Sequence, residues 1–149
     1  MIGVLHLYKQ DKDRSAGGRH DEIDVELSSQ APGVISWDTY RDDNWKNDYR
    51  QNAMHRGDFT NTHRIRGLEA FDSTRFNTYV IDWRPHRVTW LINGIPIASA
   101  SEAVPTMPME IRLDVYYKRA WNAFLGIKPA GTGGLEIRAV SYTPYHATA

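Results

Sequence analysis

The sequence predicts an all-β protein, and three observations carry that prediction. Apolar residues show no sustained helical spacing, and short β-branched and aromatic runs recur between clusters of Gly, Pro, Asn and Asp. Asn93-Gly94, between two such runs, supplies the two positive-φ residues of a tight hairpin. Pro85 marks a second turn, because it has no amide hydrogen to give to a β-ladder. We therefore predict antiparallel strands.

The length of 149 residues suits a single domain, residues 1–149. The polar stretch Arg41 to Gly67 is predicted to be a long loop with one strand near its end, and it could border a functional site. Strands are expected at Val4–Tyr8, Glu22–Leu27, Val34–Tyr40, Thr78–Trp83, Arg87–Ile92, Ile95–Ala100, Glu110–Tyr117 and Leu135–Tyr142.

The charge composition disfavours several kinds of partner. Eighteen basic and eighteen acidic residues cancel, so no net field attracts nucleic acid or an anionic membrane, and neither is expected as a partner. The absence of cysteine excludes disulfides and thiolate metal sites. The apolar run Met1 to Leu7 is too short for a signal peptide, and no run approaches the length of a membrane span.

The strand Glu22 to Leu27 alternates strictly between acidic and apolar residues. Successive side chains on a strand point to opposite faces, so Glu22, Asp24 and Glu26 share one face. Clustered carboxylates raise the pKa of at least one member, which is the asymmetry that acid/base catalysis uses. The same spacing also fits a solvated outer strand with no chemical role.

The distance between residues along a strand limits how Glu22 and Glu26 could act as a catalytic pair. Residues i and i+4 lie roughly 13 Å apart, whereas the two carboxyl groups of a retaining glycosidase lie about 5 Å apart. Glu22 and Glu26 would therefore have to lean toward each other on a twisted sheet, with Asp24 between them.

Several segments in order along the chain resemble the catalytic region of glycoside hydrolase family 16, the family of lichenases, endo-β-1,3-glucanases, agarases and xyloglucan transglycosylases. The segments are Gly3 to Tyr8, His20 to Leu27, Phe76 to Pro85, Val88 to Gly94, Pro105 to Ile111 and Leu135 to Tyr142. The uninterrupted Glu-x-Asp-x-Glu pattern is similar to the lichenase and transglycosylase branch. The match spans nearly the whole chain, which makes it far more specific than the acidic triplet.

The resemblance implies a concanavalin A-like β-jelly-roll of two antiparallel sheets with a concave sugar-binding face. It also implies a retaining reaction by double displacement without a cofactor. Carried over by position, Glu22 is the nucleophile, Glu26 the acid/base residue and Asp24 the group that tunes Glu22. The expected partner is a polysaccharide such as a β-glucan, and the full-length protein is expected to be secreted.

Substrate-binding residues are expected around this triad. On the strand that begins at Glu110, one face carries Arg112, Asp114 and Tyr116, of which Tyr116 is the candidate sugar platform, with plain packing as the alternative. Family members often carry Asn where this chain has Asp114 and Trp where it has Tyr116. Further candidates are Trp37 and Trp121, placed in or beside loops, with capping of the core as the alternative for each, and Asn77 in the Phe76 to Pro85 segment.

No metal site is expected, because none of the six histidines forms a pair with metal-ligand spacing beside other ligands. Many family members hold a structural calcium through an acidic residue in the final strand, where this chain has Arg138. Trp83 and Trp90 are predicted to lie in the core.

In the family, several strands precede the segment with which this chain begins. The resemblance therefore leaves open a fragment, or a reduced member that completes its sheets through another copy as a homo-oligomer. The predicted function is an endo-acting β-1,3/1,4-glucan hydrolase. The alternatives are a catalytically weak, lectin-like binding module and a transglycosylase.

Overall fold

The computed structural model describes residues 2–10, 19–28, 34–42, 53–58, 67–69, 71–116 and 134–145. Eight strands and no helix occur in these ranges, so no described helix is long and apolar enough to cross a membrane. The strands are β1 (Ile2–Gln10), β2 (His20–Ser28), β3 (Val34–Asp42), β4 (Ala53–Asp58), β5 (Tyr79–Arg84), β6 (Arg87–Ile92), β7 (Ile95–Ala100) and β8 (Glu110–Tyr116). The all-β prediction is confirmed.

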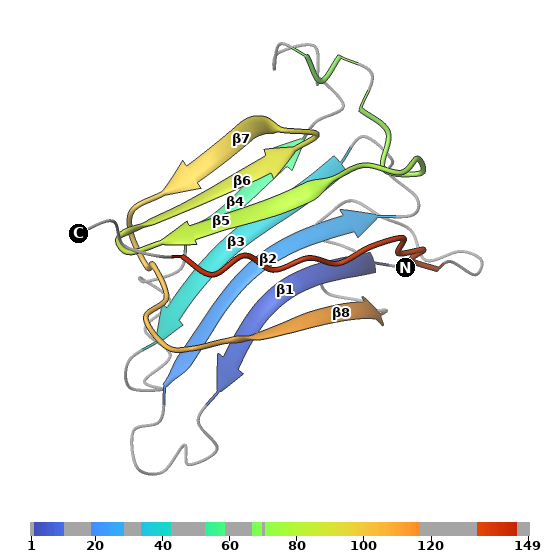
Figure 1. Ribbon diagram of the computed structural model, residues 1–149. Coiled ribbons are helices and arrows are strands. Elements are labelled where there is room, and N and C mark those ends of the chain that lie inside the picture. Colours follow the sequence, from blue (N-terminus) through green and yellow to red (C-terminus); the bar gives the residue numbers. More distant parts are fainter. Residues whose placement is uncertain are drawn as a thin grey trace.

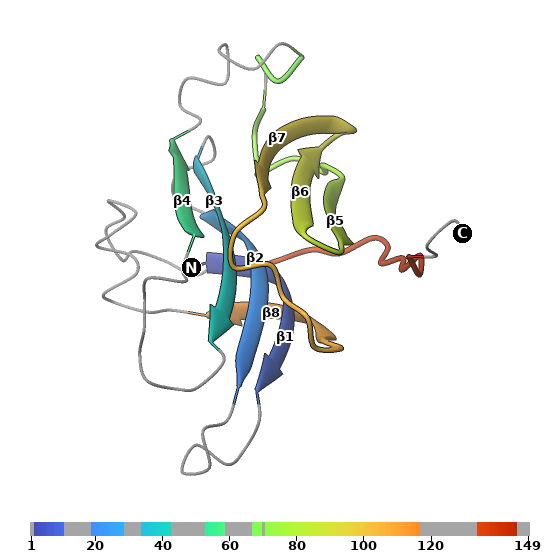
Figure 2. The same cartoon turned by 90° about the vertical axis from the view of Figure 1, so that its left-hand side faces the viewer.

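The strands form two antiparallel sheets that lie in separate layers (Figures 1 and 2). One sheet has the order β4-β3-β2-β1-β8 and the other has the order β5-β6-β7. The five-stranded sheet bows toward the smaller one, so its free face is concave (Figure 2). This is the predicted jelly-roll sandwich.

Turn residues fix the hairpins of the smaller sheet. Asn93 and Gly94 take φ values of 51° and 80° between β6 and β7, as the tight turn requires. His86 takes φ 64° after Pro85, between β5 and β6. Pro96 lies in β7, an edge strand, where its missing amide hydrogen costs no ladder bond.

The core lies between the two sheets, where odd-numbered residues of β2 and β3 meet even-numbered residues of β6. Trp90 is fully buried there, and its indole Nε1 donates a 3.0 Å hydrogen bond to the backbone carbonyl of Asp24. This bond ties β6 to the middle of the carboxylate strand. The buried core also contains Ile23, Val25, Ile35, Trp37, Val88 and Ile92.

A second anchor holds the start of β2. The Asp21 side chain is fully buried, and its Oδ2 accepts hydrogen bonds from the backbone amides of Thr106 (2.7 Å) and Met107 (2.9 Å). Trp83 also contacts this loop, because its Nε1 donates to the carbonyl of Pro105 at 3.1 Å. The loop that precedes β8 is thereby fastened to the strand that carries the acidic triplet.

The predicted strand Leu135–Tyr142 is not a strand. Residues 134–145 form an extended segment that belongs to neither sheet and runs between β5 and β1 in Figure 1. Leu135 lies against Gly3 of β1, and the guanidinium of Arg138 lies 3.4 Å from the ring centre of Phe76. The alternation of apolar residues does correspond to an extended backbone. The segment is not a strand because it forms no β-ladder with any described strand.

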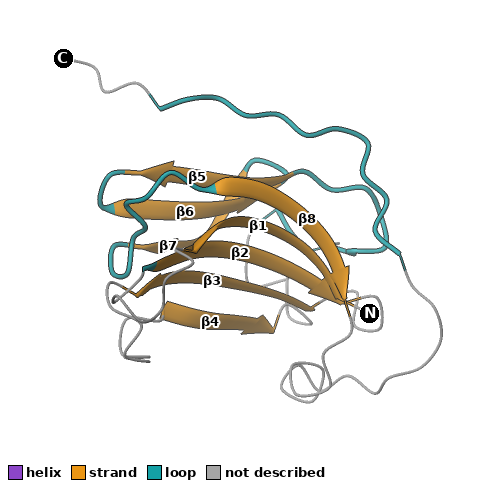
Figure 3. Ribbon diagram, turned by 90° about the horizontal axis from the view of Figure 1, so that it is seen from below, coloured by secondary structure: helices purple, strands orange, loops and turns teal. Residues whose placement is uncertain are grey.

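The sandwich is open beside β8. A cavity of about 2060 Å³ lies between the layers and is lined by both sheets and the extended segment. The core-side residues of β8 remain 36 to 42% exposed; they are Ile111, Leu113 and Val115. Figure 3 shows the extended segment passing over this region outside both sheets.

Candidate active site

The strand β2 presents three carboxylates on the concave face and its apolar residues to the core. Ile23 and Val25 are buried against the smaller sheet, so the alternating residues Glu22, Asp24 and Glu26 point away from it. Neighbouring strands bring further polar groups beside the triplet, because register pairs Asp24 with His6 of β1 and with Asp38 of β3. The predicted face is confirmed.

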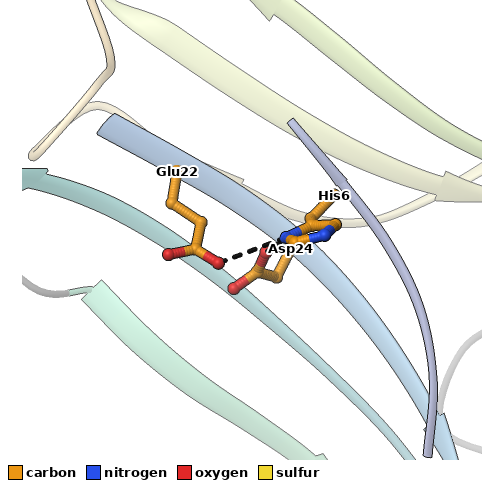
Figure 4. A group of neighbouring side chains, drawn as sticks. All are labelled: His6, Glu22 and Asp24. Atoms are coloured by element: carbon orange, nitrogen blue, oxygen red, sulfur yellow. Dashed lines mark hydrogen bonds and ion pairs between the residues drawn. The ribbon is translucent and has the colours of Figure 1, made fainter. Parts of the chain in front are cut away.

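Glu22 is held between two imidazoles. One carboxylate oxygen lies 2.8 Å from His20 Nε2. The other lies 3.3 Å from His6 Nδ1, and Figure 4 draws this second contact. Burial alone would raise the pKa of Glu22, but its contacts with His20 and His6 outweigh burial and lower the pKa to about 2. Glu22 is therefore an ionised, oriented carboxylate at neutral pH.

Asp24 has the opposite electrostatic environment. Burial, followed by the negative charges of Glu22, Glu26 and Asp38, raises the pKa of Asp24 well above its ordinary value. A protonated Asp24 is a hydrogen-bond donor, and its neighbour Glu22 is an acceptor. Burial and neighbouring charges thus shift the pKa values of these two adjacent carboxyl groups in opposite directions.

Asp38 was not singled out from the sequence. It lies opposite Asp24 on β3. Burial raises its pKa to about 7; a hydrogen bond from the Thr39 amide opposes the rise, and the charges of Glu22 and Glu26 add to it. The alternation of Ser36, Asp38 and Tyr40 along β3 is the sequence pattern that could have indicated Asp38. It identifies the concave face only once the register between β3 and β2 is known.

The Asp38 carboxyl should make stability depend on pH. Its folded pKa of about 7 lies above its ordinary 3.8, so the group destabilises the fold progressively as pH rises from about 4 to about 7. We expect Asp38→Asn to gain about 4 kcal/mol in free energy of unfolding, relative to wild type, between pH 4 and pH 8. Denaturant unfolding at both pH values measures this. An equal difference at the two pH values would contradict it.

Glu26 lies at the other end of the triplet and is only 7% exposed. Its Oε2 accepts a 3.1 Å hydrogen bond from the hydroxyl of Ser36, the residue opposite it on β3. Ser36 therefore fixes one carboxyl oxygen of Glu26.

Two of the predicted residues on β8 reach the same face. Asp114 Oδ2 lies 2.8 Å from His6 Nε2, so Asp114 joins the triplet through the imidazole. The Arg112 guanidinium lies 4.1 Å from the ring centre of Tyr8 and donates to Glu110 Oε2 at 3.0 Å. Neither residue contacts the three carboxylates directly.

An aromatic row crosses the strands beside Glu22 and was missed from the sequence. Ring centres are 5.0 Å apart between Tyr8 and His20 and 4.4 Å apart between His20 and Tyr40. The three rings come from β1, β2 and β3, respectively, and no linear motif brings them together. Aromatic side chains suit contact with the apolar faces of sugar rings.

The structure places two of the predicted substrate-binding residues away from the concave face. Trp37 is not beside a loop but in β3 opposite Val25, and it is 8% exposed within the core on the far side of the sheet. The Asn77 amide donates to the carbonyls of Asp72 and Arg75 and accepts from Asn93, which commits it to a turn beside the smaller sheet.

Two further candidates lie outside what the structure describes. Tyr116 ends β8 opposite Ile2, but its side chain is not among the described ones. Trp121 lies outside the described residues. Both stay predictions.

One group of side chains on this face has the spacing of metal ligands. Within the described ranges, His6, Glu22 and Asp24 offer one ligand atom each, all within 4.8 Å of one another. A metal requires a neutral imidazole, and the pKa of His6 is raised: burial lowers it, but hydrogen bonds with Glu22 and Asp114 prevail. The protonated imidazole competes with a metal for the same carboxylates, and we assign none.

A two-sheet sandwich whose concave face carries adjacent carboxyl groups with oppositely shifted pKa values has the features of a β-sandwich glycoside hydrolase. The chain belongs to glycosyl hydrolases family 16, whose family model matches residues 4–136. The expected family is confirmed.

Two bacterial relatives named beta-glucanase match over much of this chain. The protein from Brevibacillus brevis is 26% identical over 100 residues, which cover 67% of this chain and 33% of that protein. The protein from Paenibacillus polymyxa is 25% identical over 118 residues, which cover 75% of this chain and 41% of that protein. The chain therefore spans about a third to two fifths of these relatives.

Solved structures confirm the fold. The Bacillus licheniformis beta-glucanase superposes with a TM-score of 0.61 at 18% identity, covering 88% of this chain and 53% of that chain. A prokaryotic beta-1,3-1,4-glucanase (lichenase) derived from a mouse hindgut metagenome superposes with a TM-score of 0.59 at 19% identity, covering 85% of this chain and 50% of that chain.

Proposed function

We propose that this protein is a retaining, endo-acting glycoside hydrolase that cleaves β-1,3/1,4-linked glucan or a related polysaccharide. The observation that carries the proposal is that two neighbouring carboxyl groups on β2, those of Glu22 and Asp24, have pKa values shifted in opposite directions. Glu22 is held ionised between two imidazoles, whereas burial and neighbouring negative charges raise the pKa of the adjacent Asp24. A stable anion beside a proton donor is what a carboxylate nucleophile needs.

The proposed reaction is a double displacement. Glu22 attacks the anomeric carbon and forms a glycosyl ester, while Glu26 gives its proton to the departing glycosidic oxygen. Glu26, now a carboxylate, removes a proton from water, which attacks the ester and releases the sugar with retained configuration. Asp24 lies beside Glu22 in both steps and is proposed to tune its charge without reacting.

The concave face and the names of the relatives support the substrate class. Tyr8 and Tyr40 flank Glu22 across the sheet and offer apolar ring faces to a glucan chain. Two relatives bear the name beta-glucanase, and one structural neighbour is a beta-1,3-1,4-glucanase. Secretion of the full-length protein and self-association through open strand edges stay predictions.

A panel of soluble polysaccharides tests the proposal. Wild type is incubated with mixed-linkage β-1,3/1,4-glucan, β-1,3-glucan, xyloglucan, agarose and an α-glucan control, and reducing ends and chain lengths are both measured. We expect reducing ends and a rapid fall in chain length from mixed-linkage glucan. Redistributed chain lengths without new reducing ends would instead indicate a transglycosylase, and binding without either change would indicate a lectin-like module.

A further inference from the structure

One side chain on the concave face lies between carboxylates of two different strands. The His6 imidazole on β1 has Nδ1 3.3 Å from Glu22 Oε1 and Nε2 2.8 Å from Asp114 Oδ2. Nδ1 also lies 3.6 Å from Asp24 Oδ1. Figure 4 shows the imidazole beside Glu22 and Asp24. Both ring nitrogens therefore face carboxylate oxygens.

The protonation state of His6 decides whether its Nδ1 donates a hydrogen bond to Glu22. An imidazolium donates from both nitrogens, whereas a neutral imidazole donates from only one. The contact with Asp114 is shorter than that with Glu22, so the single proton of the neutral form is expected to stay on Nε2. The lone pair of Nδ1 then points at Glu22, so the attraction between the imidazole and the carboxylate is replaced by repulsion between the Nδ1 lone pair and a carboxylate oxygen.

We propose that His6 and Asp114 form a positioning pair, in which Asp114 keeps His6 doubly protonated and His6 thereby aims Glu22 and keeps it ionised. The reaction-related part of this inference rests on the proposed function. Asp114 is the more exposed partner, with 55% of its side chain accessible against 12% for His6, so it acts from the solvent side of the imidazole. The raised pKa of His6 agrees with the pair.

Other charged groups around His6 do not replace this pair. Arg112 lies directly opposite His6 on β8, but its guanidinium is turned to Tyr8 and Glu110. His20 contacts the other oxygen of Glu22. The ionisable groups that face His6 from its own and the packed strands are Tyr8 on β1, Glu22 and Asp24 on β2, and Arg112 and Asp114 on β8.

The test titrates the imidazole directly. Asp114→Asn preserves size and removes the charge, and Glu110→Gln is the matched control, an exposed carboxylate on the same face of β8 that binds Arg112 instead. We expect the NMR titration midpoint of His6 to fall by about 0.5 to 1 pH unit in Asp114→Asn and to stay unchanged in Glu110→Gln. An unchanged midpoint in Asp114→Asn would overturn the pair.

A second titration follows Glu22 and needs no activity. His6→Asn retains an amide donor near the Nδ1 position but carries no charge, so the carboxyl carbon of Glu22 should titrate at least one pH unit higher than it does in wild type. Glu110→Gln should leave that midpoint in place. An unshifted Glu22 midpoint in His6→Asn would overturn the claim that His6 keeps Glu22 ionised.

Kinetics then connect the pair to the reaction. In Asp114→Asn, the alkaline fall of kcat on mixed-linkage glucan should move to lower pH by the same amount as the His6 midpoint, with KM changed less than about two-fold. A shifted His6 midpoint with an unmoved kcat profile would refute the positioning role. If wild type released no reducing ends, the proposed hydrolase function would be refuted. The two NMR titrations test the His6–Asp114 pair without requiring activity.

Discussion

Glu22→Gln is expected to lower kcat on mixed-linkage glucan by at least about 10³-fold while the fold persists. An amide oxygen is a far weaker nucleophile than a carboxylate, and the Gln side chain has one acceptor oxygen where the carboxylate places one oxygen against His6 and the other against His20. The loss should appear in kcat, because the substitution removes the atom that bonds to the anomeric carbon and leaves the rest of the concave face intact.

The measurement is reducing-end release at saturating glucan, with denaturant unfolding of the same preparations. Glu110→Gln is the matched control: it makes the same chemical change on the same sheet, at a residue whose carboxylate pairs with Arg112. Its kcat should stay within about two-fold of wild type. Glu22→Gln that folds and retains more than about a tenth of the activity would exclude Glu22 as nucleophile.

Local sequence predicted those parts of the site that lie on one strand. Alternation along β2 was enough to place Glu22, Asp24 and Glu26 together, because side-chain direction on a strand depends only on position. The turn at Asn93-Gly94 was likewise predictable, since its backbone conformation is a local requirement. Both features need no knowledge of the partner strands.

The remainder of the site depends on strand register, which is a long-range property. His6 and Asp38 reach Asp24 only because β1 and β3 pair with β2 in one specific register, and Asp114 reaches His6 across 108 residues of sequence. Trp37 was misplaced for the same reason. Its pairing with Val25 puts it on the core face, whereas its position beside a predicted loop had suggested sugar contact, with capping of the core as the alternative.

Glu26→Gln is expected to separate the two roles on β2 by its dependence on the leaving group. On glucan, whose departing alkoxide needs a proton, kcat should fall by about 10² to 10⁴-fold, the usual contribution of general acid catalysis. On a dinitrophenyl β-glucan oligosaccharide, the departing phenolate is stable without protonation, so formation of the glycosyl ester on Glu22 should remain close to the wild-type rate.

Pre-steady-state release of dinitrophenol measures that first step, and intact-protein mass spectrometry detects the glycosyl ester. Because Glu26 also activates water, the ester should accumulate in Glu26→Gln as a burst followed by slow turnover. Ser36→Ala, which removes the hydroxyl that binds Glu26 Oε2 but leaves the carboxyl group in place, is the matched control and should show a much smaller loss on glucan. Equal losses on both substrates would mean that Glu26 does not protonate the leaving oxygen.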